Sequence, residues 1–304
     1  MNSISRLFCI ALVLLGPAFP QVSQSAPAAS DNLGGASRRV ETPFKLYRGY
    51  IIVVQGSVGS LRRLNFAIDT AAYPTIVDPR ITERLKVRLP GGSRSLALFS
   101  GVADAKKVVL PSLQLGPLEA KSLPVVTHDL TPLGENLGIR LDALVGLDVL
   151  SLSSFSIDYR AKKIVFGPVE WSPFSVPFDT VPVSVAPVLT VQLSVQDEPL
   201  RLVIDTGSPE LILFSCQLRD HLHQPPVSGS LRQILDGAGE LSVLTEMSLS
   251  RVHLGTMDLP LREALVDEGE ANCRLPFDGV LGVAHLGLRW VAFDFAHWAF
   301  SWQR

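Results

Sequence analysis

Two aspartates of this chain, Asp69 and Asp205, each follow an apolar run and stand 136 residues apart. The first lies in Phe66-Ala67-Ile68-Asp69-Thr70-Ala71-Ala72 and the second in Leu202-Val203-Ile204-Asp205-Thr206-Gly207-Ser208. An apolar strand delivers a carboxylate to a place where water is scarce, and desolvation raises its pKa unless hydrogen bonds offset the effect. Two carboxylates that face each other can share a proton, so this pair predicts general acid–base chemistry.

Two further segments repeat at the same offset. Leu144-Val145-Gly146 matches Val280-Leu281-Gly282, and Ser156-Ile157-Asp158-Tyr159 matches Ala292-Phe293-Asp294-Phe295. Three landmarks at one offset of 136 residues indicate an internal repeat. Because each copy carries one aspartate, the two become a facing pair only if the copies pack around a two-fold axis.

The residues beside Asp205 can hold its carboxylate in place. Gly207 permits a turn that residues with a Cβ resist, and it lets another backbone come close. Ser208 can donate a hydroxyl hydrogen bond to the Asp205 carboxylate. The hydroxyl of Thr206 can bond across to its counterpart, Thr70, while the glycine of Val280-Leu281-Gly282 would give room beside the turn.

An apolar strand into Asp-Thr-Gly-Ser, followed by apolar-apolar-Gly in the same unit, resembles the aspartic proteases. Asp278-Gly279-Val280-Leu281-Gly282 and the matching run from Asp142 to Leu150 resemble the bacterial retropepsin-like branch. The resemblance implies an all-β, bilobal acid-protease fold, with two retropepsin-like β-barrel lobes related by a pseudo-two-fold. Both copies lie in one polypeptide, as in the pepsins, so we expect a monomer to suffice.

The same resemblance implies roles for the matching residues. Asp69 and Asp205 match the catalytic aspartates, which activate a water that hydrolyses a peptide bond. Thr70 and Thr206 match the threonines that lock the two aspartate turns together, and Gly207 and Ser208 complete the support of the dyad. A peptide or protein is the implied substrate, and neither a metal nor an organic cofactor is required.

The first motif departs from the family pattern, because Ala71 stands where the family has glycine. A methyl group at the tightest part of the turn could shift Asp69. This leaves open an alternative function, in which a catalytically inactive relative binds peptides or a protein partner in the cleft between the lobes. The hairpins that cover the cleft in the family have three candidate turns here: Gly91-Gly92, Ser100-Gly101 and Asp236-Gly237-Ala238-Gly239.

The order of segments predicts an exported protein. Arg6 precedes the apolar run Leu7–Phe19, and Ala26-Pro27-Ala28 offers a cleavage site, so we expect a periplasmic or secreted protein, with an uncleaved anchor as the alternative. Prolines about five residues apart predict an extended connector between the repeats. The expected division is 1–28 signal peptide, 29–41 flexible lead-in, 42–167 first lobe, 168–187 proline-rich linker and 188–304 second lobe.

Short alternating or β-branched runs predict the strands. One helix is predicted over Asp78–Leu85, where Asp-Pro offers an N-cap followed by proline at the first helical position. The predicted strands are Tyr50–Val54, Leu64–Ile68, Val108–Leu115, Ile164–Phe166, Val188–Val195, Leu200–Ile204, Met247–Leu254 and Ala299–Trp302.

Composition excludes several other classes. Apolar residues make up 47% and charged residues 18%, which excludes a disordered chain. The balance of 27 basic and 29 acidic side chains gives a net charge of −2, so nucleic acid is not an expected partner, and neither is a membrane once the signal is removed.

A few polar and sulfur-containing residues remain outside the repeat motifs. Cys216 and Cys273 could form a disulfide in an oxidising compartment or remain two buried thiols. His221 and His223 could lie on one face of a strand, but no third zinc ligand is near them in sequence. Asp158 and Asp294 follow strands at matched positions and are predicted to cap turns.

Overall fold

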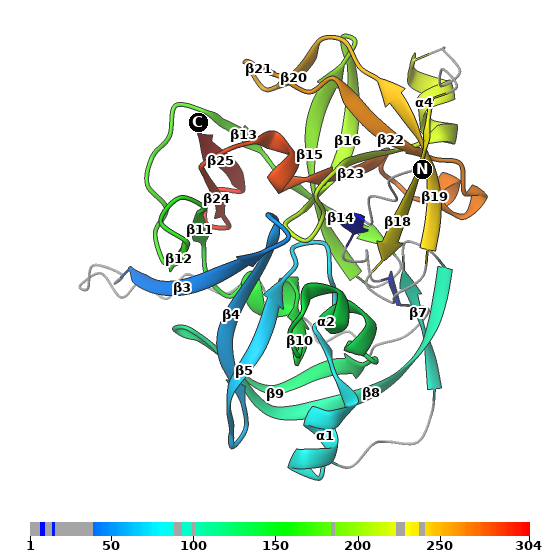
Figure 1. Ribbon diagram of the computed structural model, residues 1–304. Helices are drawn as coiled ribbons and strands as arrows, with labels where there is room; N and C mark the ends of the chain where they lie inside the picture. Colours follow the sequence, from blue (N-terminus) through cyan, green and yellow to red (C-terminus); the bar gives the residue numbers. More distant parts are fainter. Residues whose placement is uncertain are drawn as a thin grey trace.

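The computed structural model describes residues 7–9, 14–15, 39–87, 93–98, 101–183, 186–222, 229–236 and 241–304. Strands dominate it and form one sheet of 11 strands and another of 14. In Figure 1 they gather into two lobes, with the first half of the chain mostly in the lower lobe and the second half mostly in the upper one. The expected all-β, bilobal fold is therefore confirmed.

Where the first half is described, three α-helices lie between its strands. The helices are α1 (Pro79–Leu85), α2 (Thr131–Leu137) and α3 (Leu147–Leu150). The strands are β3 (Val40–Tyr47), β4 (Ile51–Val58), β5 (Leu61–Ile68), β6 (Ile76–Val77), β7 (Ser93–Leu98), β8 (Gly101–Leu115), β9 (Leu118–Thr127), β10 (Ala143–Val145), β11 (Phe155–Asp158) and β12 (Lys163–Phe166).

The second half is built in the same manner. Its helices are α4 (Ser215–Leu222) and the 3₁₀ turns η1 (Glu270–Arg274) and η2 (Val283–Leu286). Its strands are β13 (Ser175–Pro177), β14 (Asp179–Val183), β15 (Ala186–Val195), β16 (Glu198–Asp205), β17 (Leu211–Phe214), β18 (Leu231–Asp236), β19 (Leu241–Ser248), β20 (Val252–Leu254), β21 (Met257–Leu259), β22 (Glu263–Asp267), β23 (Gly279–Gly282), β24 (Trp290–Asp294) and β25 (Ala299–Gln303).

The two strands that lead to the aspartates are buried where they end. The last three residues of β5, 66–68, and the three residues before Asp205 in β16, 202–204, are all 0% exposed. Each strand has a neighbour on both sides, since β5 lies between β4 and β10 and β16 lies between β15 and β23. Burial of a large apolar side chain stabilises the folded state by about 1.5–3 kcal/mol, so these strand ends are firmly anchored.

A sheet shared by both halves joins the lobes. In it β11 of the first half pairs antiparallel with β24 of the second, and Ser156 lies opposite Ala292. These two residues are counterparts in the predicted repeat, separated by the same 136 positions as the aspartates. Antiparallel pairing of a segment with its own copy, counterpart against counterpart, is the arrangement that a two-fold axis produces.

The proline-rich linker is extended, as predicted, but it is also paired. Its strand β13 pairs with β25 at the end of one sheet, and β14 pairs with β15 beside the path of the other. Both strands contain a proline, Pro177 and Pro182. Proline lacks an N–H and is tolerated on an edge strand, where no neighbour needs that donor.

Local predictions hold for the helix and fail for one strand. Asp78 caps α1, and its side chain accepts a hydrogen bond from the backbone N–H of Arg80 at 3.0 Å. The strand predicted over Met247–Leu254 is instead broken between β19 and β20. Arg251 has a left-handed φ of 53° at the break, which turns the chain from β22, the partner of β19, to β15, the partner of β20.

Each half contributes a long hairpin beyond its aspartate. In the first half β7 pairs with β8, and in the second half β18 pairs with β19. Among the residues of the candidate turns, Gly101 is the first of β8 and Asp236 is the last of β18. The other candidate residues, Ser100, 237–239 and Gly91-Gly92, lie outside the described residues. Two short N-terminal strands contact the same hairpins: β1 (Leu7–Cys9) pairs with β18, and β2 (Leu14–Leu15) pairs with β7.

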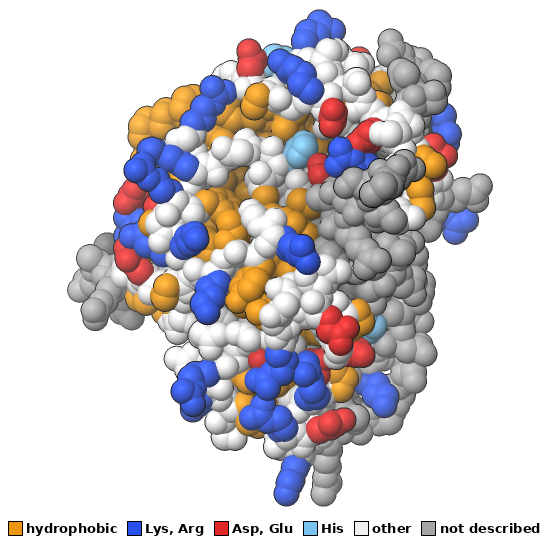
Figure 2. Space-filling view, in the orientation of Figure 1, with side chains coloured by type: hydrophobic (Ala, Val, Ile, Leu, Met, Phe, Trp, Pro, Cys, Tyr) orange, Lys and Arg blue, Asp and Glu red, His pale blue; other side chains and the backbone are white. Residues whose placement is uncertain are grey.

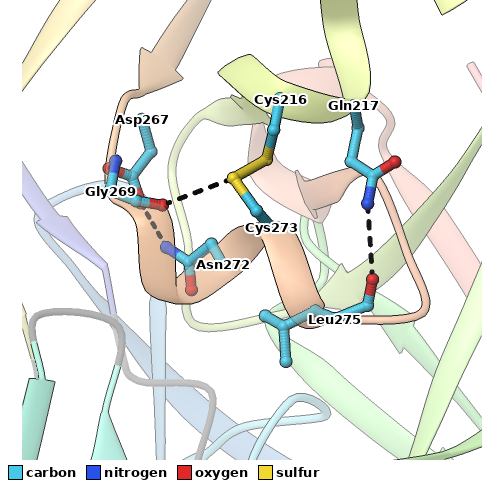
Figure 3. The surroundings of a disulfide bond; sticks show 7 residues. All are labelled: Cys216, Gln217, Asp267, Gly269, Asn272, Cys273 and Leu275. Atoms are coloured by element: carbon cyan, nitrogen blue, oxygen red, sulfur yellow. Dashed lines mark hydrogen bonds between the residues drawn. A yellow bond between two sulfur atoms is a disulfide. The ribbon is translucent and has the colours of Figure 1, made fainter. Parts of the chain in front are cut away.

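A disulfide between Cys216 and Cys273 fastens the second lobe, with a Cα–Cα distance of 5.6 Å. It ties α4 to η1, and Figure 3 shows the Gln217 side chain donating to the carbonyl of Leu275 beside it, at 3.5 Å. Of the two alternatives that the sequence left open, a disulfide or two buried thiols, the structure shows the disulfide. No helix in the described part of the chain has the length and apolar character needed to cross a bilayer.

Candidate active site

Asp69 and Asp205 occupy equivalent places in the two halves. Asp69 follows β5 directly and Asp205 is the last residue of β16, and they are 0% and 1% exposed. A short parallel strand flanks each: Ile68 pairs with Val145 of β10, and Ile204 pairs with Leu281 of β23. Each carboxyl group therefore lies at the buried end of a central strand.

The threonines after the aspartates join the two turns by reciprocal hydrogen bonds. The Thr70 hydroxyl donates to the carbonyl of Ile204 at 2.7 Å and accepts from the N–H of Thr206 at 3.1 Å. The Thr206 hydroxyl donates to the carbonyl of Ile68 at 3.0 Å and accepts from the N–H of Thr70 at 3.1 Å. All of these groups are buried, so the four bonds hold the aspartate turns of the two halves face to face.

Each carboxylate accepts hydrogen bonds from backbone N–H groups of its own turn. Oδ1 of Asp69 accepts from Ala71 at 2.9 Å and from Ala72 at 3.1 Å. Oδ1 of Asp205 accepts from the N–H of Gly207 at 2.6 Å. Because these donors are rigid backbone groups, they fix the orientation of both carboxyl groups before any substrate binds.

Burial raises the pKa of both carboxyl groups. For Asp69 desolvation is the largest cause, and the N–H groups of Ala71 and Ala72 oppose it. For Asp205 desolvation again comes first, the negative charge of Asp69 adds to it, and the N–H groups of Gly207 and Ser208 oppose it. Each group affects the ionisation of the other, so the pair can hold one proton near neutral pH.

Ala71 fits the turn without strain. Neither Ala71 nor Gly207 has a positive φ, so the turn does not require the left-handed backbone that favours glycine. The Ala71 side chain is 1% exposed and packs with apolar residues of the second lobe, including Val188 and Val203. From the sequence, the Ala71 methyl group could shift Asp69. The structure instead provides space for this methyl group at the contact between the lobes.

The glycines of the two apolar-apolar-Gly segments are required by close backbone contacts. A Cβ on Gly146 would lie 2.4 Å from the carbonyl oxygen of Ala72, and one on Gly282 would lie 2.5 Å from that of Ser208. These segments therefore pack directly against the aspartate turns, as predicted. The Ser208 hydroxyl donates to the carbonyl of Glu210 at 3.3 Å, and the Ser208 backbone N–H acts on Asp205. A bond from the Ser208 hydroxyl to Asp205 stays a prediction.

A second support of the first turn was missed by sequence reasoning. The Thr75 hydroxyl donates to Asp148 Oδ1 at 2.7 Å and accepts from the N–H of Gly146 at 3.0 Å, and the Thr75 N–H donates to Asp148 Oδ2 at 2.9 Å. Desolvation raises the pKa of Asp148 to about 6, although the hydrogen bonds from Thr75 lower it. The signal was a carboxylate placed two residues after Gly146, where Ala284 stands in the second copy.

The remaining polar candidates have structural roles where the structure describes them. Asp158 accepts from the N–H of Ala161 at 2.7 Å, and Asp294 accepts from that of Ala296 at 3.1 Å, which confirms the predicted turn caps. His221 faces Asp278 at 3.7 Å, and His223 lies outside the described residues. Within the described ranges, no three His, Cys, Asp or Glu side chains gather as a metal site would need.

Comparison with known proteins agrees with this geometry for the first half of the chain. Residues 54–149 match the model of a family described as aspartyl protease. The matched range includes Asp69, Thr70 and the segment that ends at Gly146. No curated protein matches the chain. The family match, on a two-lobed all-β fold, supports an aspartyl protease family for this protein.

Proposed function

We propose that this protein is an exported aspartic endopeptidase that hydrolyses peptide bonds with a water activated by Asp69 and Asp205. The observation that carries the proposal is the reciprocal bonding of Thr70 and Thr206, which holds the two buried aspartate turns against each other. A buried carboxyl pair with raised pKa values is suited to proton transfer near neutral or mildly acidic pH.

The chemistry needs one ionised and one protonated carboxyl group. The ionised aspartate takes a proton from the water as the water oxygen attacks the carbonyl carbon of the peptide. The protonated aspartate donates to the developing oxyanion, and a proton then passes to the amine as the C–N bond breaks. Gly207 holds the Asp205 carboxylate through its backbone N–H, and Ser208 fastens the end of the same turn.

The substrate in this proposal is an extended peptide or an unfolded protein segment. Apolar side chains gather across the middle of the face in Figure 2, between the upper and lower parts of the molecule. The outer strands of the two hairpins, β18 and β7, pair with β1 and β2 in the structure. Removal of residues 1–28 would free both edges, and an extended substrate could add there by backbone hydrogen bonds.

The proposed mature protein is a monomer that acts outside the cytoplasm and needs no metal or organic cofactor. It begins after residue 28 and consists of the two lobes, 42–167 and 188–304, joined by the linker 168–187. The disulfide of Cys216 and Cys273 agrees with an oxidising compartment. One chain supplies both aspartate turns, so a second copy is not needed to complete the dyad.

The alternative, an inactive relative that binds peptides or a protein partner in the cleft, rested on Ala71. Because the Ala71 methyl group packs without a left-handed backbone, that residue does not favour loss of activity. The two functions differ in one measurable respect: only the enzyme loses peptide cleavage when a dyad carboxylate is neutralised.

The test compares Asp69→Asn and Asp205→Asn with the unmodified mature chain on an unfolded protein substrate. Each variant keeps the size of the side chain and removes its ability to ionise, so we expect cleavage to fall by at least about 1,000-fold with the fold intact. Asp158→Asn is the matched control, since it changes a turn-capping aspartate and should keep full activity. A pepstatin-type inhibitor should block the unmodified chain, and cleavage that survives both dyad substitutions would end the proposal.

A further inference from the structure

Glu210 and His285 form a charged pair close to the Asp205 turn. Glu210 lies five residues after Asp205, and His285 belongs to η2, directly after the Gly282 segment. Nδ1 of His285 stands 3.3 Å from Oε2 of Glu210, and the two side chains are 20% and 17% exposed. We call this pair the Glu210–His285 brace.

Short hydrogen-bonded steps connect the brace to the dyad. The carbonyl of Glu210 accepts from the N–H of Gly282 at 2.9 Å and from the hydroxyl of Ser208 at 3.3 Å. The N–H of Glu210 in turn meets the Ser208 hydroxyl at 3.4 Å. Since the backbone N–H of Ser208 acts on Asp205, a displacement of Glu210 is transmitted to that carboxylate through a single residue.

The surroundings make the brace sensitive to charge. Desolvation raises the pKa of Glu210, while the positive charges of His285 and Arg232 favour its ionised form and the negative charges of Glu263 and Glu246 oppose it. Arg232 of β18 is itself paired with Glu246 of β19. The brace thus lies where the Asp205 turn, η2 and the hairpin of the second lobe meet.

The histidine ring has little else to hold it. Its Nε2 is buried and makes no hydrogen bond to any residue that the structure describes. The neighbouring Ala284 packs against apolar residues of the first lobe, so η2 lies at the contact between the lobes. Among the described residues, the polar contact of the ring is with Glu210.

The first lobe fastens the equivalent turn with different chemistry. There Thr75 and Asp148 connect the turn to the Gly146 segment by hydrogen bonds from a hydroxyl and a backbone N–H. No histidine takes part in that set. An imidazole, unlike those donors, gains its positive charge in the range between about pH 5 and 8.

We propose that Glu210 and His285 are positioning residues for Asp205, and that they hold the turn more firmly when His285 is protonated. This inference rests on the proposed peptidase function. A charged imidazolium–carboxylate contact is stronger than a neutral one, so the contact holds the Asp205 turn best when His285 is charged and Glu210 is ionised. The support of the Asp205 turn would then depend on the charges of Glu210 and His285.

The experiment measures kcat and KM of the mature chain at about pH 5.5 and about pH 7.5, on either side of the ordinary histidine range. For Glu210→Gln and His285→Gln we expect kcat to fall about tenfold at the lower pH with little change in KM. A displacement of a catalytic group by about 1 Å costs about 100-fold in rate, and the displacement expected here is smaller. At the higher pH the loss should shrink to about twofold, since the neutral pair contributes less. The double variant should be no worse than either single variant, as expected for two residues that act through one contact.

Two further variants make the test specific. His297→Gln removes a histidine that pairs with Asp294 at 2.7 Å on an exposed turn, and it should leave both kinetic constants unchanged. His285→Lys keeps a positive charge at both pH values and should restore most of kcat, which a purely structural role of the ring would not predict. Unfolding midpoints of all variants verify that each one is folded.

Each other outcome overturns the inference. Values of kcat within twofold of the unmodified chain at both pH values would show that the pair does not position Asp205. An equal loss at both pH values, or a change confined to KM, would assign the pair to packing or to substrate binding. If the unmodified chain cleaves no peptide, or if its cleavage is unchanged by Asp69→Asn and Asp205→Asn, the proposed function itself is refuted. The role of the brace is then refuted with it.

Discussion

The bonding of Thr70 and Thr206 gives the most direct prediction about how the lobes cooperate. Each hydroxyl serves two backbone groups of the opposite turn, and both side chains are 0% exposed. Thr70→Val keeps the shape of the side chain but removes the hydroxyl, so the N–H of Thr206 and the carbonyl of Ile204 lose this partner. A buried group without its hydrogen bond costs about 1–3 kcal/mol, and two of them lower the free energy of unfolding by about 2–6 kcal/mol.

The assay is denaturant-induced unfolding of the mature chain, followed by the rate of peptide cleavage. Thr70→Ser is the matched control, because it keeps the hydroxyl and removes one methyl group, which costs about 1 kcal/mol. Thr206→Val removes the other two of the four bonds and should cost about as much. The double variant should lose less than the sum of the two, since substitutions within one contact network are not additive. A Thr70→Val variant within about 0.5 kcal/mol of the unmodified chain would refute the reasoning, because that is the range of an ordinary surface substitution.

Four further outcomes are expected. Burial raises the pKa of Asp69 above its value in the unfolded chain. The stability that its protonated form contributes is therefore complete below about pH 4 and is lost as the pH rises through the folded pKa. In unfolding experiments across this pH range, Asp69→Asn should reduce the fall in stability. Ala71→Gly should keep kcat and lower the free energy of unfolding by about 1 kcal/mol, through the added freedom of the unfolded chain and the lost methyl contact. Replacing Cys216 and Cys273 by serine opens a loop with a sequence separation of 57, which should lower the free energy of unfolding by about 4 kcal/mol in the chain-entropy treatment; an unchanged urea midpoint would contradict this. A chain that starts at residue 29 lacks β1 and β2, so amide exchange in β7 and β18 should be faster than in the full chain, as mass spectrometry can measure.

The parts of the fold that could be read from the sequence are those with local causes. The helix over Asp78–Leu85 was found because its cap and its proline act within one turn, and α1 begins at Pro79 as they require. The strand predicted over Met247–Leu254 is not intact, although apolar residues at 247, 249, 252 and 254 lie close enough to suggest a single run. The alternation changes phase at the break, and the pairing of β19 with β22 and of β20 with β15 shows that the chain turns at Arg251.

The candidate site shows the same division. The repeat located Asp69, Asp205 and both threonines, since one offset relates them without any knowledge of their contacts. Sequence reasoning missed the pairs Thr75–Asp148 and Glu210–His285. Each pair joins an aspartate turn to a segment about 70 residues farther along the chain, so no local spacing connects its members.

From its residues alone the chain could be expected to contain a repeat and a pair of candidate aspartates, because similar apolar runs and turn residues recur at one offset. How the two halves meet became visible only in three dimensions. The reciprocal threonine bonds, the space for the Ala71 methyl group, the disulfide and the unlike supports of the two turns all depend on distances between residues far apart in sequence. Packing brings such residues together, and packing energies belong to pairs of surfaces rather than to any single segment.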